Sequence, residues 1–140
     1  MAKGHLTGML GVYLVAAELS RLNFIVSPTS RSAAGADLLV TDEACRMAWS
    51  VQVKTNRRAT GFWLVGKSAL TIRSPSHVYV FVNLRGDIRP DYIVASSGYV
   101  ADHTKTSRSS TGSIWYEFHG KDRPYPEEGW DEVFSVGAFG

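Results

Sequence analysis

One helical segment at the start of the chain is followed by a run of short strand-like segments. Residues 9–22 carry apolar side chains around most of a helical circumference, which predicts a helix packed on more than one side. Little further helical pattern occurs before Ala95. This order does not fit alternating strand and helix units. It predicts an α/β (α+β) fold in which a helix lies on a mixed sheet.

The strand predictions rest on short apolar segments bounded by turn residues. We expect strands at residues 24–26, 36–41, 47–55, 62–65, 69–72, 77–84 and 91–95. Asn23 is a plausible left-handed end to the helix, and residues 42–45 predict a hairpin turn. Residues 104–113 predict a polar loop, and the aromatic segment after Ile114 should pack on the body. No domain boundary is visible, so we expect one domain over residues 1–140.

Composition excludes several classes of protein. No apolar run approaches the ~18 residues of a membrane-spanning helix, and the first residues do not resemble a cleavable signal peptide. The one cysteine, Cys45, cannot form an intrachain disulfide or a multi-cysteine zinc site. We therefore expect a cytoplasmic protein that does not contact membranes.

The charges are unevenly distributed. Fifteen basic and 13 acidic residues give a net charge of only +2, but no acid occurs between Glu43 and Asp87. That interval holds Arg46, Lys54, Arg57, Arg58, Lys67, Arg73 and Arg85. A basic middle third suits a polyanion such as nucleic acid, although scattered charges also simply solvate a surface.

Three polar residues stand out within the predicted hairpin. Asp37 begins one strand, and Gln52 and Lys54 lie on one face of the next. A carboxylate and an amide oxygen are hard ligands that suit Mg²⁺, and a nearby lysine can hold a phosphate or orient a water. The alternative is that Gln52 and Lys54 form the wet face of a half-covered sheet.

Four segments together resemble a known family. They are GVYLVAAEL at 11–19, FIV at 24–26, GADLLV at 35–40 and VQVKT at 51–55. In this order they resemble the PD-(D/E)XK nuclease superfamily, in particular small bacterial predicted endonucleases related to archaeal Holliday junction resolvases. The resemblance covers residues 4–55, and beyond Lys54 only the strand order matches.

The resemblance implies both a fold and a chemistry. The fold would be restriction-endonuclease-like, with a mixed central sheet flanked by helices. The activity would be metal-dependent hydrolysis of phosphodiester bonds in DNA, with Mg²⁺ or Mn²⁺ as cofactor. Asp37 and Gln52 would be metal ligands, the Val53 carbonyl a third, and Lys54 the catalytic lysine.

One position departs from this pattern. Resolvase-like members carry a glutamate on the first helix, about twelve residues before the aromatic of the first strand. Counting back from Phe24 gives Val12, which cannot bind a metal. Glu18 lies on a different helical face and is either an accessory acid or, as we favour, a surface charge.

The remaining expectations concern partners. The candidate contacts to nucleic acid, for which we favour DNA, are Arg31, Arg57, Arg58 and Lys67. Phe62 and Trp63 either stack on bases or belong to the core. Cutting two strands would favour a homodimer. The competing hypotheses are a catalytically impaired nucleic-acid-binding module and a protein-interaction module with the same fold.

Overall fold

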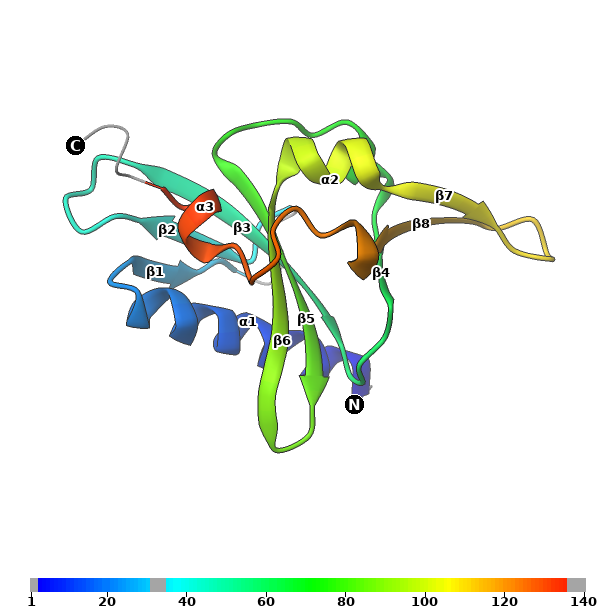
Figure 1. The fold of residues 1–140 in the computed structure, drawn as a ribbon, viewed down its shortest axis with the longest axis horizontal. Coiled ribbons are helices and arrows are strands. Elements are labelled where there is room, and N and C mark those ends of the chain that lie inside the picture. Colours follow the sequence, from blue (N-terminus) through cyan, green and yellow to red (C-terminus); the bar gives the residue numbers. More distant parts are fainter. Residues whose placement is uncertain (1–2, 31–34, 136–140) are drawn as a thin grey trace.

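The computed structural model describes residues 3–30 and 35–135, which form two sheets and several helices (Figure 1). The helices are α1 (Lys3–Arg21), α2 (Ser97–His103) and α3 (Trp130–Val133), with 3-10 turns η1 at Lys67–Leu70 and η2 at Gly120–Asp122. The strands are β1 (Ile25–Pro28), β2 (Leu38–Thr41), β3 (Ala48–Asn56), β4 (Phe62–Val65), β5 (His77–Arg85), β6 (Ile88–Ser96), β7 (Lys105–Arg108) and β8 (Ile114–His119).

The larger sheet is mixed. Its five strands lie in the order β1-β2-β3-β5-β6, with β3 and β5 parallel and the other neighbours antiparallel. A three-stranded sheet, β4-β8-β7, lies beside it. The expected α+β class, with a mixed sheet and flanking helices, is confirmed.

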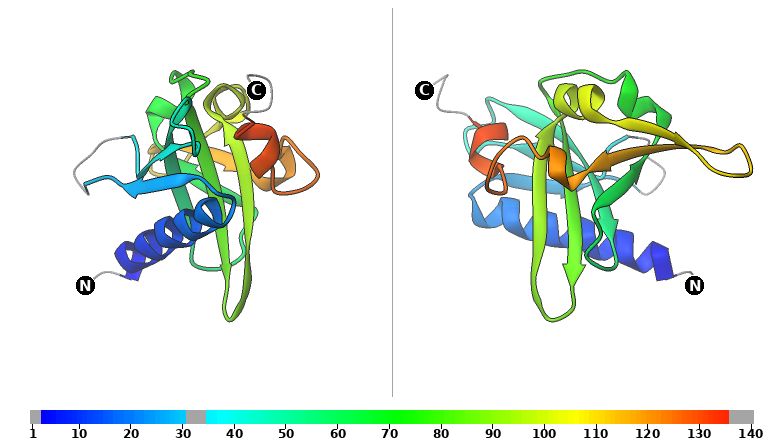
Figure 2. Two further views of the ribbon diagram at one scale, coloured as in Figure 1. Left: turned by 90° about the vertical axis from the view of Figure 1, so that its left-hand side faces the viewer. Right: turned by 45° about the vertical axis from the view of Figure 1, so that its right-hand side comes forward.

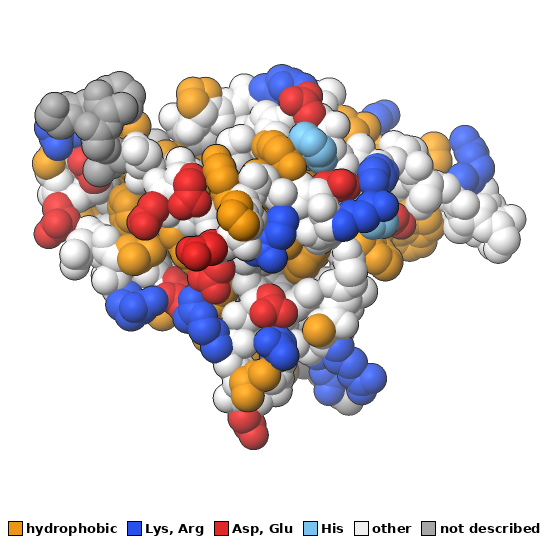
Figure 3. Space-filling model, in the orientation of Figure 1, with side chains coloured by type: hydrophobic (Ala, Val, Ile, Leu, Met, Phe, Trp, Pro, Cys, Tyr) orange, Lys and Arg blue, Asp and Glu red, His pale blue; other side chains and the backbone are white. Residues whose placement is uncertain are grey.

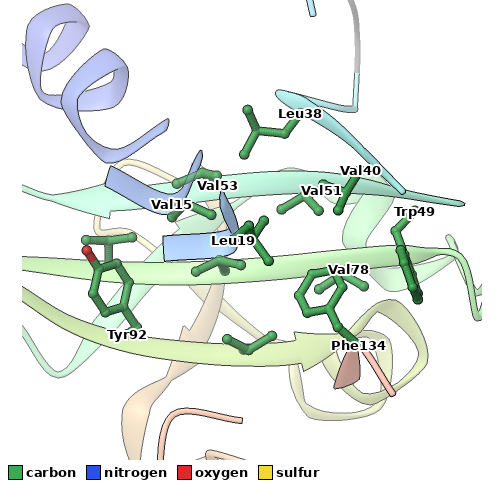
Figure 4. Packing of buried hydrophobic residues seen from close by; sticks show 13 residues of the cluster. Val15, Leu19, Leu38, Val40, Trp49, Val51, Val53, Val78, Tyr92 and Phe134 are labelled. Carbon is green, nitrogen blue, oxygen red and sulfur yellow. The ribbon is translucent and has the colours of Figure 1, made fainter. Parts of the chain in front are cut away.

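Helix α1 lies against one face of the larger sheet (Figure 2). Val15 and Leu19 are fully buried there against Val51 and Val78, because apolar positions spaced four apart share one helical face (Figure 4). The helix ends at Arg21, and Asn23, two residues further on, has the left-handed conformation expected from the sequence, with a positive φ of 72°.

The β2–β3 hairpin is fixed by its turn. The Asp42 carboxylate accepts hydrogen bonds from the backbone N–H groups of Arg46 (2.8 Å) and Met47 (2.9 Å). Both hydrogen bonds lower the pKa of Asp42, and the bond from the Met47 N–H has the larger effect. Cys45 adopts a positive φ of 55° in the same turn. The turn sets the register that places Leu38 opposite Val51.

The side chains of β3 alternate between a buried face and a partly exposed face. Val51 and Val53 pack toward α1, whereas their neighbours in β3 point to the other face. The strand β5 is buried on both faces: Val80 contributes to the α1 side and Phe81 to the side of the smaller sheet. On that second side Phe81 stacks on Phe118 of β8, with ring centroids 4.4 Å apart.

Helix and sheet approach most closely at Gly11. A Cβ atom there would lie 1.8 Å from Thr55 Oγ1 and 2.8 Å from Thr55 Cβ. A side chain at position 11 therefore cannot be accommodated without a shift of α1 or of β3. Glycine at position 11 therefore allows α1 to pack as closely against β3 as it does.

Three predicted segments differ from the structure. Residues 69–72 belong to η1 and the chain after it, not to a strand. The predicted polar loop at 104–113 contains β7 and the turn that leads into β8. Helix α2, with Ser96 as N-cap, was not expected. The aromatic C-terminal segment packs on the body as predicted, with Phe134 5.4 Å from Trp49 between ring centroids.

Within residues 3–30 and 35–135, no helix is both long enough and apolar enough to span a membrane.

Candidate active site

Asp37 is held at the point where β2 begins. Its N–H donates to the Val51 carbonyl (2.8 Å), and its carbonyl accepts from the Thr29 N–H (2.9 Å). The carboxylate Oδ2 accepts from the Val53 N–H (2.7 Å). These three contacts fix the carboxylate beside β3, so Asp37 is a preorganised acid and not a loosely held surface charge.

A cavity of about 320 Å³ opens in front of Asp37. Its lining includes Val12 from α1, Val53 from β3 and the polar residues Thr29 and Ser30 after β1. Asp37 is the one acid among the described residues that line it. Val12 and Asp37 thus line a common space.

Gln52 and Lys54 lie on the other face of β3. They alternate with Val51 and Val53, and their register partners in β5 are Tyr79 and Phe81. Both side chains are partly exposed and do not line the cavity. The structure therefore places Asp37 close to Val12 and to the backbone of Val53. The side chains of Gln52 and Lys54 lie on the opposite side of β3 from this group.

An open strand edge nevertheless borders both groups. The β2–β3 ladder runs only from the Thr41–Ala48 pair to the Leu38–Val51 pair. Among the described residues, none of β2 pairs with residues 52–56 of β3 in this ladder.

The donor chemistry at this edge suits a hard divalent cation. The described residues hold no group of three or more His, Cys, Asp and Glu side chains placed to bind a metal ion together. Mg²⁺ does not need such a group, because it retains several waters and is commonly held by one or two carboxylates plus substrate phosphates. One fixed carboxylate beside an open cavity fits that mode of binding.

Glu18 belongs to a different cluster. Its side chain accepts from Arg21 (2.9 Å) and from Arg89 of β6, and Arg89 also bonds Glu128 (2.8 Å). Glu18 is only 8% exposed, so the favoured expectation of a surface charge is wrong. It does not line the Asp37 cavity. The glutamate instead joins α1 to β6 and to the C-terminal segment.

This cluster predicts acid sensitivity. Burial raises the pKa of Glu18, but the bonds from Arg21 and Arg89 outweigh it and hold the pKa below its usual value. The resulting stabilisation is fully present at pH values above the pKa that Glu18 has in the unfolded chain. It is lost as the pH falls through the lower pKa that Glu18 has in the folded protein. Glu18→Gln should cost on the order of 1–3 kcal/mol near pH 7, and less at low pH. Urea unfolding at several pH values measures this.

A matched control is Glu43→Gln, which neutralises an exposed acid in the β2–β3 turn. Its unfolding free energy should stay within about 0.5 kcal/mol of the parent. A Glu18→Gln deficit that did not shrink on acidification would contradict the proposed ion-pair origin.

The described candidate contacts to nucleic acid lie at the two ends of β4. Arg57 and Arg58 are exposed in the β3–β4 loop, and Lys67 is exposed in η1 after β4. Arg31 falls outside the described residues. In Figure 3 basic side chains occur at the lower right, below the smaller sheet. The cavity residues Thr29 and Ser30 were not anticipated, because a polar loop carries no spacing signal of its own.

Comparisons with known proteins find similarity in structure and none in sequence. No family model matches the chain, and no curated protein is significantly similar to it in sequence. Among solved structures, Hjc, a Holliday junction resolvase from the archaeal hyperthermophile Archaeoglobus fulgidus, is similar with a TM-score of 0.48. The match has 8% identity and covers 80% of this chain and 90% of Hjc.

Proposed function

We propose that the chain is a metal-dependent endonuclease of the restriction-endonuclease-like, PD-(D/E)XK type that hydrolyses phosphodiester bonds in DNA. The observation that carries the proposal is the fixed Asp37 carboxylate, which faces an open cavity at the end of the β2–β3 ladder. The order of the sequence motifs around Asp37 and Lys54 supports it independently.

The residues have separate tasks in this proposal. Asp37, the Gln52 amide oxygen and the Val53 carbonyl would hold Mg²⁺ or Mn²⁺ at the open edge of β3. The bound ion would neutralise charge on the scissile phosphate and lower the pKa of a water. Lys54 contributes a partly exposed side chain. Its amine would hold the phosphate or orient the attacking water.

A second candidate is a nucleic-acid-binding or protein-interaction module that kept the fold without turnover. The observation that favours it is Val12, an apolar side chain facing the same cavity as Asp37. With one acid among the described lining residues, metal affinity would be low. Cleavage of duplex DNA, assayed with Mg²⁺, with Mn²⁺ and with EDTA, distinguishes the two candidate functions.

If the chain cleaves both strands of a duplex, a homodimer would place one active site on each strand.

Binding to DNA should depend on the β3–β4 loop. We expect Arg57→Ala with Arg58→Ala to weaken binding to all sequences alike and to reduce the salt slope by up to about two units, roughly one per phosphate contact. Fluorescence anisotropy with a labelled duplex in EDTA, at several salt concentrations, measures the slope. An unchanged slope would mean that both arginines merely solvate the loop.

A further inference from the structure

The smaller sheet has one buried face and one open face. Trp63 and Phe118 point inward and are almost completely buried, and the Trp63 Nε1–H donates to the Val82 carbonyl (2.9 Å). The alternating side chains therefore point outward. Phe62, Leu64 and Trp115 are 37%, 47% and 44% exposed, which is unusual for three large apolar residues on one small sheet.

The strand register gathers rings on this open face. Phe62 lies opposite His119, and the two rings are 5.7 Å apart between centroids with planes tilted by 30°. Trp115 lies on the same face of β8, four residues before His119 and therefore about 13 Å along the strand. Aromatic rings are thus exposed at two places along the β4–β8 pair. One place holds Phe62 and His119, and the other holds Trp115.

The charges around the rings favour an anionic ligand. Arg57 and Arg58 are exposed in the loop that enters β4, and Lys67 is exposed just after that strand. In Figure 3 hydrophobic side chains lie over β8, with basic side chains above and below them.

One acid lies on the face itself. Both oxygens of the Glu117 carboxylate are engaged, one with His119 Nε2 (3.1 Å) and one with the Ser107 hydroxyl (3.1 Å). Lys105, its register partner in β7, places its amine 3.1 Å from Asp122 instead. The Glu117 carboxylate is therefore held by hydrogen bonds, and exposed cations flank the sheet at the two ends of β4.

We infer that the open face of the β4-β8-β7 sheet binds unpaired nucleotides by stacking bases on Phe62, His119 and Trp115. Aromatic rings on an open sheet face bind nucleic acid by stacking on the faces of bases. These faces are accessible in a single strand, whereas in a duplex they are covered by the neighbouring base pairs. Arg57, Arg58 and Lys67 would contact the phosphates. The inference shares nucleic acid as a ligand with the proposed function and does not require its metal.

Binding in EDTA to three labelled oligonucleotides of equal length tests this inference: oligo(dT), an abasic strand with the same phosphates, and a duplex. We expect the strongest binding to oligo(dT). Phe62→Ala and Trp115→Ala should each weaken that binding roughly tenfold, in line with the worth of one base–aromatic stack. Trp115→Phe should restore most of the loss. Ile88→Ala, at an exposed apolar position in another hairpin, is the matched control and should have no effect.

The outcomes are distinguishable. Equal binding to oligo(dT) and the abasic strand would overturn the inference, because phosphates alone would then explain the affinity. So would light scattering that showed a dimer dispersed by Phe62→Ala with Trp115→Ala, since the face would then bind a second copy. These binding measurements contain no metal, so a failure to detect metal-dependent cleavage would not affect them. A preference for oligo(dT) in a protein that does not cleave DNA would support the stacking face and contradict the proposed endonuclease function.

Discussion

Asp37→Asn is expected to abolish Mg²⁺-dependent DNA cleavage while leaving the chain folded. The asparagine amide oxygen can still accept from the Val53 N–H, so the local anchor survives while the charge that would hold the metal is lost. Lys54→Ala should have a comparable effect, because it removes a cation from the phosphate. A metal-assisted hydrolytic site supplies several kcal/mol of transition-state stabilisation, so each loss should be about 10³-fold or more.

Initial cleavage rates with a supercoiled plasmid, together with thermal unfolding, measure both effects. The matched control is Asp87→Asn, which neutralises an exposed acid in the β5–β6 turn and should keep the parental rate. Retention of the parental rate by Lys54→Ala, or cleavage that persists in EDTA, would remove the basis of the proposed chemistry.

Val12→Glu should strengthen metal binding. Val12 faces the same cavity as Asp37, so a carboxylate at position 12 would offer the second acid that the cavity lacks. Without metal, the like charge beside Asp37 should lower stability by about 1–2 kcal/mol. With Mn²⁺ present, the extra carboxylate should raise affinity at least about tenfold, which corresponds to about 1.4 kcal/mol.

Val12→Gln is the matched control, because it has nearly the same length and no charge. Mn²⁺ titration by electron paramagnetic resonance, with thermal unfolding in EDTA and in Mn²⁺, compares the two variants. A lower melting temperature for Val12→Glu without any gain in Mn²⁺ affinity over Val12→Gln would show that position 12 is a packing position and not the place of a lost acid.

Sequence patterns predicted the central elements because burial leaves a strong periodic signal. The run at 77–84 is apolar nearly throughout, as a strand buried on both faces must be, and β5 is such a strand. The segment containing β7 carries no such signal. Lys105, Thr106 and Arg108 are exposed in an edge strand, so nothing in their order distinguishes strand from loop.

For the candidate site residues, the sequence predicted the strands on which they lie but not the faces of the sheet that their side chains occupy. The spacing of Asp37, Gln52 and Lys54 indicates neighbouring strands, and the β2–β3 pairing agrees with that. Which face each side chain occupies depends on what covers the sheet, namely α1 on one side and the smaller sheet on the other. Glu18 could not be placed either, because its partner Arg89 lies 71 residues further along the chain.

The contact between Gly11 and Thr55 bears on how such a site can change over evolutionary time. Because α1 is seated on β3 at residue 11, the adjacent residue 12 is held at a constant depth beside the Asp37 cavity whatever side chain it carries. Exchange of an acid for valine, or the reverse, alters the lining of the cavity without re-seating the helix. One substitution at position 12 would therefore suffice to change the number of acids that line this cavity.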